Sequence, residues 1–220
     1  MGLLGKRNDY GADALAAESL GDNPLRALQR WVMDAELDGM YEPSAFVLAT
    51  VGENGRPTSR TVLLRHVDDR GLQFFTNYES CKAQALAATE FASATFGWYA
   101  MQRQVQVEGR VVKLSDAESD AYFASRPRSS QIGAWASRQS QPVDSREALE
   151  AQVAEAEARF AAVDQDGNRL PIPRPPYWGG YLIEPLRIEF WKGRSSRLHD
   201  RIEFTRAAAG EQWTVRLLQP

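Results

Sequence analysis

The stretch AFVLATVGENGRPTSRTVLLRHVDDRGLQFFT, residues 45–76, decides the fold. Asn54-Gly55 and Asp69-Arg70-Gly71 are turn signals, and they separate three runs rich in β-branched and aromatic residues. Short runs joined by such turns are typical of antiparallel strands that follow one another in a meander. The predicted strands are residues 45–51, 58–65 and 72–76.

The same pattern continues toward the C-terminus. Residues 92–99 and 103–114 alternate in polarity like two more strands of this sheet, and the valines of the second share one face. The proline-rich residues 171–176 are expected to form a stiff extended linker into the last strands. Those strands are predicted at residues 180–184, 187–192, 201–206 and 213–218.

Helix signals flank these strands. Asn23-Pro24 provides an N-cap followed by proline at the first helical position, and Ser115 with Glu118 forms a capping box. The predicted helices run from Pro24 through Ala35, from Ser80 as a cap to Leu86, from Ser115 toward Ser125, and from Asp144 to Ala162.

About eight strands with a few helices indicate a mainly β protein, a small barrel or two-layer structure with helices packed outside. We expect one domain at residues 23–220, since 220 residues with 43% hydrophobic content support a single full core. Residues 1–22 show no clear period and are expected to form a flexible arm or lid.

Charge and cysteine content narrow the function classes. The 26 basic and 29 acidic residues leave a net charge of -3, which gives no electrostatic footprint for nucleic acid or an anionic membrane. Cys81 is the single cysteine and there are two histidines, so neither an intramolecular disulfide nor a structural zinc site is expected. No segment has the pattern of a signal peptide or membrane span, which predicts a soluble cytoplasmic protein.

Three segments carry side chains suited to anions. Residues 122–140 are dense in hydroxyl, amide and guanidinium groups, and residues 189–201 combine an aromatic ring with three arginines and a histidine. The alternative interpretations are a solvated helix–loop surface and a basic hairpin with a core tryptophan. On the predicted strand, Arg60 and Arg65 point to opposite faces, and Lys82 lies at a helix N-terminus that favours phosphate.

Several catalytic patterns are missing from the sequence. It has no nucleophile elbow, no metal-ligand spacing and no glycine-rich dinucleotide or P-loop motif. Its side chains alone are therefore poorly equipped for difficult chemistry. Two phosphate-seeking clusters in one chain favour a bound organic cofactor that the protein orients.

Taken in order, these segments closely resemble the pyridoxine/pyridoxamine 5'-phosphate oxidases, from roughly residue 23 to the C-terminus. The most characteristic runs are SQIGAWAS at 130–137 and RLHDR at 197–201. The resemblance implies a split β-barrel homodimer with FMN at the subunit interface. It also implies oxidation of pyridoxamine and pyridoxine 5'-phosphates by O2 to pyridoxal 5'-phosphate, with release of H2O2 and, from the amine, NH3.

The resemblance assigns roles residue by residue. FMN would take a hydride equivalent from C4' of the substrate, with Arg197 and His199 as the catalytic residues and Arg197 orienting the pyridine ring. The implied substrate-binding residues are Arg65, Tyr122, Arg126, Ser130, Arg197, Leu198 and His199. The implied FMN-binding residues are Arg60, Thr61, Val62, Leu63, Leu64, Arg65, Phe75, Thr76, Lys82, Gln104, Gln139, Ser140, Trp191 and Arg201.

Three positions depart from the family pattern. Cys81 replaces an arginine that contacts the FMN phosphate, which is expected to weaken FMN binding by roughly 1.5–3 kcal/mol. Arg65 replaces a lysine, so a larger planar fork stands where a compact ammonium is usual. Near the C-terminus Arg216 is shifted by one position, which in a strand places it on the opposite face.

Two other functions fit parts of the pattern. A related split-barrel flavin oxidase with another substrate, such as a phenazine-pathway enzyme, would share the features of residues 189–201, although the phosphate set from Tyr122 to Ser130 argues against it. A non-catalytic protein that binds FMN or pyridoxal phosphate is supported only by the departures at Cys81 and Arg65.

Overall fold

The computed structural model describes residues 10, 11 and 13–220, whose strands form one antiparallel sheet. The strand order is β2-β1-β5-β6-β7-β4-β3, with β8 beside β7 and β9 beside β8. The strands are β1 (Ala45–Val51), β2 (Pro57–Leu63), β3 (His66–Asp68), β4 (Gly71–Asn77), β5 (Phe91–Trp98), β6 (Arg103–Lys113), β7 (Trp178–Lys192), β8 (Asp200–Thr205) and β9 (Thr214–Leu217).

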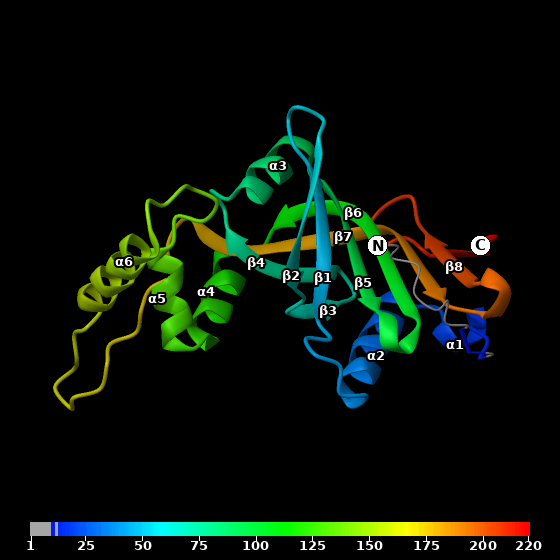
Figure 1. Ribbon diagram of the computed structural model, residues 1–220, viewed down its shortest axis with the longest axis horizontal. Coiled ribbons are helices and arrows are strands. Elements are labelled where there is room, and N and C mark those ends of the chain that lie inside the picture. Colours follow the sequence, from blue (N-terminus) through cyan, green and yellow to red (C-terminus); the bar gives the residue numbers. More distant parts are fainter. Residues whose placement is uncertain (1–9, 12) are drawn as a thin grey trace, which may run out of the picture.

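Helices lie outside this sheet (Figure 1), so the predicted mainly β architecture with peripheral helices is confirmed. They are α1 (Ala17–Leu20), α2 (Pro24–Leu37), α3 (Cys81–Thr89), α4 (Asp116–Ser125), α5 (Arg128–Ala136) and α6 (Arg146–Arg159), with 3-10 turns at Tyr99–Met101 and Ser195–Arg197. The sheet is curled: in Figure 1 the β1–β2 hairpin runs steeply across β6 and β7.

Strand β7 differs from the prediction. The two strands expected at 180–184 and 187–192 are one strand of 15 residues. Pro185 does not end it, because a bulge takes up the irregularity: consecutive Glu108 and Gly109 of β6 pair with Arg187 and Pro185, which leaves Leu186 as an extra residue on β7.

Local predictions also need correction at four places. The Ser80 side chain does not cap α3; its hydroxyl donates to the Asn77 carbonyl at 2.7 Å instead. Strand β3 and helix α5 were not predicted, and the helix expected over 144–162 is shorter and buries only Ala156 among its own residues. The N-cap at Asn23 and the capping box at Ser115 are confirmed.

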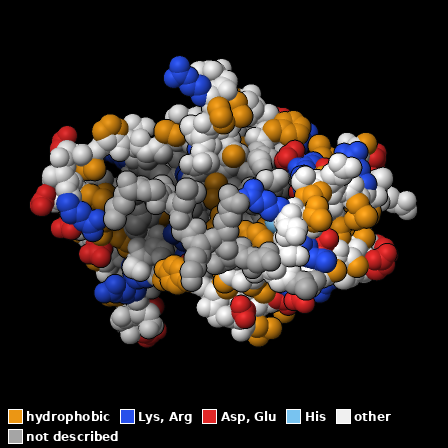
Figure 2. Space-filling model, turned by 45° about the vertical axis from the view of Figure 1, so that its right-hand side comes forward, with side chains coloured by type: hydrophobic (Ala, Val, Ile, Leu, Met, Phe, Trp, Pro, Cys, Tyr) orange, Lys and Arg blue, Asp and Glu red, His pale blue; other side chains and the backbone are white. Residues whose placement is uncertain are grey.

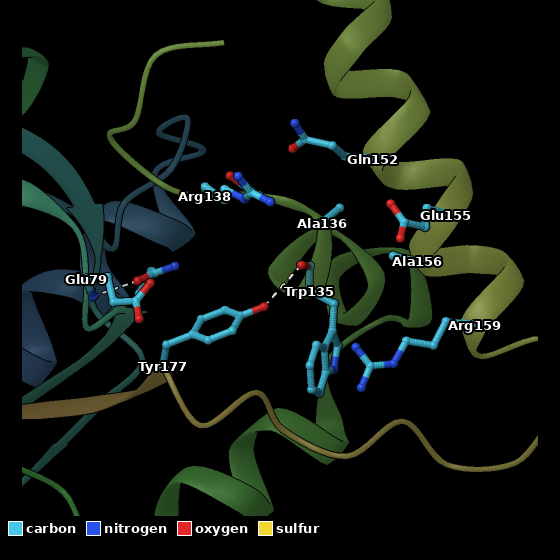
Figure 3. A pocket seen from close by; sticks show the side chains of 11 residues that line it. Glu79, Trp135, Ala136, Arg138, Gln152, Glu155, Ala156, Arg159 and Tyr177 are labelled. Carbon is cyan, nitrogen blue, oxygen red and sulfur yellow. Dashed lines mark hydrogen bonds between the residues drawn. The ribbon is translucent and has the colours of Figure 1, made fainter.

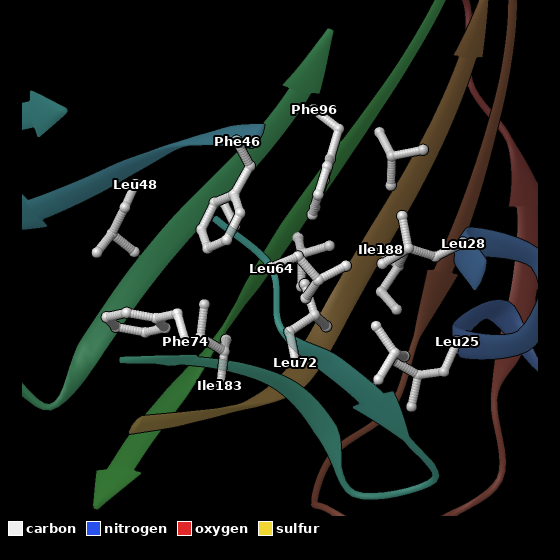
Figure 4. Packing of buried hydrophobic residues seen from close by; sticks show 14 of the residues in the cluster. Leu25, Leu28, Phe46, Leu48, Leu64, Leu72, Phe74, Phe96, Ile183 and Ile188 are labelled. Carbon is white, nitrogen blue, oxygen red and sulfur yellow. The ribbon is translucent and has the colours of Figure 1, made fainter. Parts of the chain in front are cut away.

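The main core fills the concave side of the sheet (Figure 4). Phe46, Phe74 and Phe96 come from three different strands and are buried, and α2 adds Leu25 and Leu28. Burying a side chain of this size contributes about 1.5–3 kcal/mol. The predicted alternation of β6 is confirmed, since Val105, Val107 and Val111 are buried in this core.

A second apolar cluster forms where α4, α5 and α6 gather at one end of the sheet (Figure 1). Its centre is Trp178, the first residue of β7, which contacts Phe123 from α4 in an edge-to-face arrangement at 5.2 Å. The chain segment 122–140 therefore consists largely of packed helices rather than a solvated loop.

The predicted arm, residues 1–22, is described only at residues 10, 11 and 13–22. Within that part Leu20 is buried in the main core, and the Leu15 N–H donates to Asp200 at 2.8 Å. None of the described helices is long and apolar enough to cross a membrane. On the face shown in Figure 2, Lys and Arg side chains are interspersed with Asp and Glu, in keeping with the small net charge.

Replacing Gly109 by alanine tests the bulge that keeps β7 continuous. A Cβ at this position would meet the Glu184 carbonyl oxygen at 2.1 Å, so we expect Gly109→Ala to lower the free energy of unfolding by about 1–3 kcal/mol in denaturant titration. Gly133→Ala is the control: a Cβ there meets nothing within 4 Å, and helical alanine is about 0.5–1 kcal/mol better than glycine. Equal stability of the two variants would refute the bulge argument.

Candidate functional site

A cationic cluster lies at the N-terminus of α3. The side chain of Lys82 is only 9% exposed, and its ammonium donates to Gln139 Oε1 at 2.7 Å and to the hydroxyls of Thr76 at 3.2 Å and Ser80 at 3.3 Å. Gln139 also accepts from the Thr76 hydroxyl at 2.9 Å. These hydrogen bonds hold the segment around Gln139, which is distant in sequence, against the end of β4.

The charges of this cluster have no counter-ion among the described residues. Lys82 donates only to neutral oxygens; burial lowers the pKa of its ammonium, and the nearby Arg60 lowers it further. Burial also lowers the pKa of Arg60, whose guanidinium is held by the hydroxyls of Thr50 and Thr58 at 2.8 and 2.7 Å. Buried cations without a partner are costly, so the donor set suits an anion such as phosphate.

Ser140 and Cys81 border the same cluster. Ser140 Oγ accepts from the Cys81 N–H at 3.3 Å, at the first turn of α3. The thiol of Cys81 is exposed beside Arg60 and Lys82. The position therefore adds a backbone donor to the cluster but no side-chain charge.

A second group surrounds Arg126 at the end of α4. Its guanidinium lies 4.6 Å from the ring centre of Trp178, and Nη1 is buried without a hydrogen-bond partner among the described residues. Burial lowers the pKa of Arg126; the nearby Tyr122 partly opposes this, and the smaller effect of the cation Arg65 lowers the pKa further. Tyr122 stacks on Phe75 with ring centres 3.8 Å apart.

Two other predicted segments lie near these groups. Ser130 is half-buried in the first turn of α5, where its N–H donates to the Pro127 carbonyl. Residues 61–63 end strand β2, and Leu64 and Arg65 follow it rather than lying on it as predicted. Among the described strands β2 pairs with β1 alone, which leaves alternate backbone groups unpaired on its other edge. The Leu64 side chain is buried in the core, so only its backbone is available to a ligand.

The third group lies at the other end of β7. Gln104, Trp191 and Arg201 are directly opposite one another on β6, β7 and β8, which puts their side chains on one face of the sheet. The Arg201 guanidinium is paired with the buried carboxylate of Glu189, at 2.8 Å from Nε and 3.0 Å from Nη2.

His199 lies beside Trp191, with ring centres 4.7 Å apart, and its Nδ1 accepts from the Arg194 N–H at 3.0 Å. Arg197 and Leu198 follow each other on the exposed turn before β8. Tyr10 packs edge-on against both rings, at 5.5 Å from His199 and 6.1 Å from Trp191. A cavity of about 270 Å³ beside Tyr10 is lined in part by Gln104 and Trp191.

The predicted cofactor residues therefore fall into two sets that one chain keeps apart. Thr76 is opposite Gly179 and Gln104 is opposite Trp191, which places the two sets twelve residues apart on β7. At about 3.3 Å per residue this separation is about 40 Å along the strand, far more than the length of an FMN molecule.

A larger cavity of about 730 Å³ lies next to the Gln139 segment but contains none of the predicted site residues (Figure 3). Trp135 and Tyr177 form one wall, where the Tyr177 hydroxyl donates to the Trp135 carbonyl at 3.1 Å, and Arg159 and Glu155 of α6 form another. The volume of this cavity alone does not link it to the three groups of predicted site residues.

Sequence reasoning missed three residues at these groups. Tyr10 lies in a stretch without periodicity, so nothing in the sequence indicated its contact with Trp191. Glu189 stood in the noted segment 189–201, but its contact with Arg201 depends on tertiary packing, as does the contact of Trp178 with Arg126.

Comparisons with known proteins agree along the whole chain. Residues 33–160 match the family model described as pyridoxamine 5'-phosphate oxidase, and residues 178–220 match that of the pyridoxine 5'-phosphate oxidase C-terminal dimerisation region. The chain is 49% identical to a pyridoxine/pyridoxamine 5'-phosphate oxidase of Rubrobacter xylanophilus, over 99% of this chain and 96% of that protein. A protein of the same name from Burkholderia ambifaria is 49% identical over 99% of both chains.

Among solved structures, PhzG from Burkholderia lata 383, in complex with tetrahydrophenazine-1-carboxylic acid, superposes with a TM-score of 0.83. It is 34% identical and the match covers 95% of this chain and 99% of that one. The split-barrel fold expected from the sequence is thereby confirmed. Two family models and near full-length identity of 49% place this chain in the pyridoxine/pyridoxamine 5'-phosphate oxidase family.

Proposed function

We propose that this chain is an FMN-dependent oxidase that converts pyridoxamine and pyridoxine 5'-phosphates to pyridoxal 5'-phosphate in the cytoplasm. With the amine, O2 and water are consumed and H2O2 and NH3 released; with the alcohol, O2 is consumed and H2O2 released. The family and the identity of 49% to oxidases of this name support the activity.

The observation that carries the substrate assignment is the unpartnered Arg126. A half-buried guanidinium with a free Nη1 beside a second arginine is unfavourable until an anion lies between them. The phosphate of a B6 vitamer supplies such an anion, and Tyr122 adds a hydroxyl nearby. The neighbouring aromatic rings suit a flat pyridine compound.

The cluster at α3 fits the phosphate of FMN. It offers Lys82, Arg60 and the hydroxyls of Thr76 and Ser140 without a competing carboxylate. We infer that Gln104, Trp191 and Arg201 contact the same cofactor from a second chain, because about 40 Å of β7 separates them from Thr76. The match of residues 178–220 to a dimerisation region supports this homodimer.

The chain's own residues position the reactants. When bound, FMN supplies the redox chemistry, since it accepts a hydride equivalent from the substrate and passes the electrons to O2. Arg65 and Arg126 fix the phosphate end of the substrate. Arg197 and His199 of the second chain, which come with its Trp191, approach the pyridine ring. Tyr10 covers His199 and Trp191, which excludes water from that wall.

A phenazine-pathway oxidase is the second candidate, since PhzG shares the fold at 34% identity. The ligand of that structure, tetrahydrophenazine-1-carboxylic acid, has no phosphate. A phosphate site at Arg126 and Arg65 would have no partner in such a substrate. The higher identity to the B6 oxidases favours our proposal.

The test is O2-dependent turnover by purified protein titrated with FMN. We expect pyridoxal 5'-phosphate and H2O2 to form in equal amounts from both phosphorylated vitamers, with activity that saturates as FMN is added. Flavin binding without turnover of either vitamer would favour a relative with another substrate or a binding protein. No flavin binding at all would overturn the cofactor assignment.

Arg126→Met should separate substrate binding from cofactor binding. The charge that meets the substrate phosphate is removed, so we expect KM for pyridoxamine 5'-phosphate to rise roughly 10- to 100-fold while FMN affinity stays unchanged. Weak turnover of unphosphorylated pyridoxamine should not respond. Arg159→Met is the control, because Arg159 also lies over a tryptophan, at 4.4 Å from Trp135, but outside the proposed site. A similar rise in KM in both variants would count against the phosphate role of Arg126.

Cys81→Arg should tighten FMN binding. The position lies in the first turn of α3 beside Lys82 and Arg60, so an added guanidinium can reach the cofactor phosphate. The added bond to the phosphate tightens binding, but a third cation also increases the repulsion among the cations before FMN binds. We therefore expect the Kd for FMN to fall only about tenfold, near the lower end for a charge-assisted hydrogen bond. Fluorescence titration of apoprotein measures it, and Cys81→Ser should leave Kd unchanged. An unaltered Kd for the arginine variant would contradict the expected cost of Cys81.

A further inference from the structure

Glu189 is a buried carboxylate to which the substrate and cofactor assignments give no role. It is 3% exposed, on the same face of β7 as Trp191. Both of its oxygens accept from Arg201, from Nε at 2.8 Å and from Nη2 at 3.0 Å. Two parallel bonds of this kind fix both the position and the plane of a guanidinium.

The pair belongs to a larger network across β6, β7, β8 and β9. Arg187 donates to both Glu189 and Glu203, and at 2.7 Å to Glu108. Glu203 is as buried as Glu189 and also accepts from Arg216. The network has equal numbers of positive and negative charges, from Arg187, Arg201 and Arg216 and from Glu108, Glu189 and Glu203. The shifted Arg216 thus has a defined partner, on the far side of the network from Arg201.

Arg201 retains free donors toward the open face. Of its five N–H bonds, two go to Glu189 and one goes from Nη1 to the Gln219 carbonyl at 2.9 Å. One N–H on each terminal nitrogen remains. These lie on the strand position directly opposite Trp191, where the proposed cofactor residues line the sheet.

We propose that Glu189 is a positioning residue that holds the Arg201 guanidinium in the orientation in which it contacts FMN. This inference rests on the proposed cofactor site. A buried ion pair adds little net stability compared with apolar packing, but it fixes geometry strongly. Glu189 therefore acts on cofactor affinity through Arg201, and Arg187 keeps the carboxylate in place from its other side.

Glu203 provides a matched control. Glu189 and Glu203 are directly opposite in register, both are 3% exposed, and each accepts from two arginines, but only Glu189 contacts Arg201. Glu189→Gln and Glu203→Gln remove one buried charge each. We expect similar losses in the melting temperature of the two apoproteins. We expect FMN Kd to rise about tenfold in Glu189→Gln and less than about threefold in Glu203→Gln.

A double-mutant cycle with Arg201→Gln completes the test. If Glu189 acts through Arg201, adding Glu189→Gln to Arg201→Gln causes no further loss of FMN affinity. The double variant also removes both charges, so it folds even if Glu189→Gln leaves Arg201 unpaired and unfolds the protein. Additive losses, or equal losses in Glu189→Gln and Glu203→Gln, would overturn the inference. Unchanged Kd in Arg201→Gln would also overturn the inference, because Glu189 acts through the Arg201 contact. Wild-type protein that binds no FMN would instead refute the proposed function.

Discussion

The continuity of β7 is the constraint on which the rest of the structure depends. Its first half pairs with β4 and its second half with β8, while β6 runs along nearly its whole length. Such a strand persists across Pro185 because Gly109 has no side chain to clash at the bulge. The same strand therefore carries Trp178 beside Arg126 at one end and Trp191 beside Arg201 at the other.

In the proposed homodimer, a rigid strand of this length divides each cofactor site between two chains. Flexible loops could fold the two sets of residues together, but a strand of 15 residues held in a sheet cannot. In the proposed site, association of two copies brings Thr76 and Lys82 of one chain together with Gln104 and Trp191 of the other around one ligand. On this proposal dimerisation is required for cofactor binding, and the C-terminal strands take part in both dimerisation and cofactor binding.

The sequence predicted much of this fold because its signals are local. The Asn54-Gly55 turn signal directly follows strand β1. Asn23 caps α2 and Ser115 forms a capping box with α4, each within a few residues of the signal itself. One error arose where a distant contact overrides a local rule, because Pro185 is tolerated through Gly109 on another strand. Another arose from competition between local hydrogen bonds, because the Ser80 hydroxyl donates to the nearby Asn77 carbonyl instead of capping α3. The site residues named from the family resemblance gather into three groups, but the partners of Arg126 and Arg201 required the packed structure.

Those two arginines are held in different ways, and the difference fits different tasks. Arg126 rests on the face of Trp178, which orients a guanidinium without neutralising it, and one nitrogen stays free. Its full charge is available to an incoming anion, and binding relieves the burial cost. Arg201 is neutralised by Glu189, so what it offers is direction rather than net charge. A phosphate needs the first arrangement, whereas an uncharged flavin ring, whose polar atoms must be met at fixed angles, needs the second.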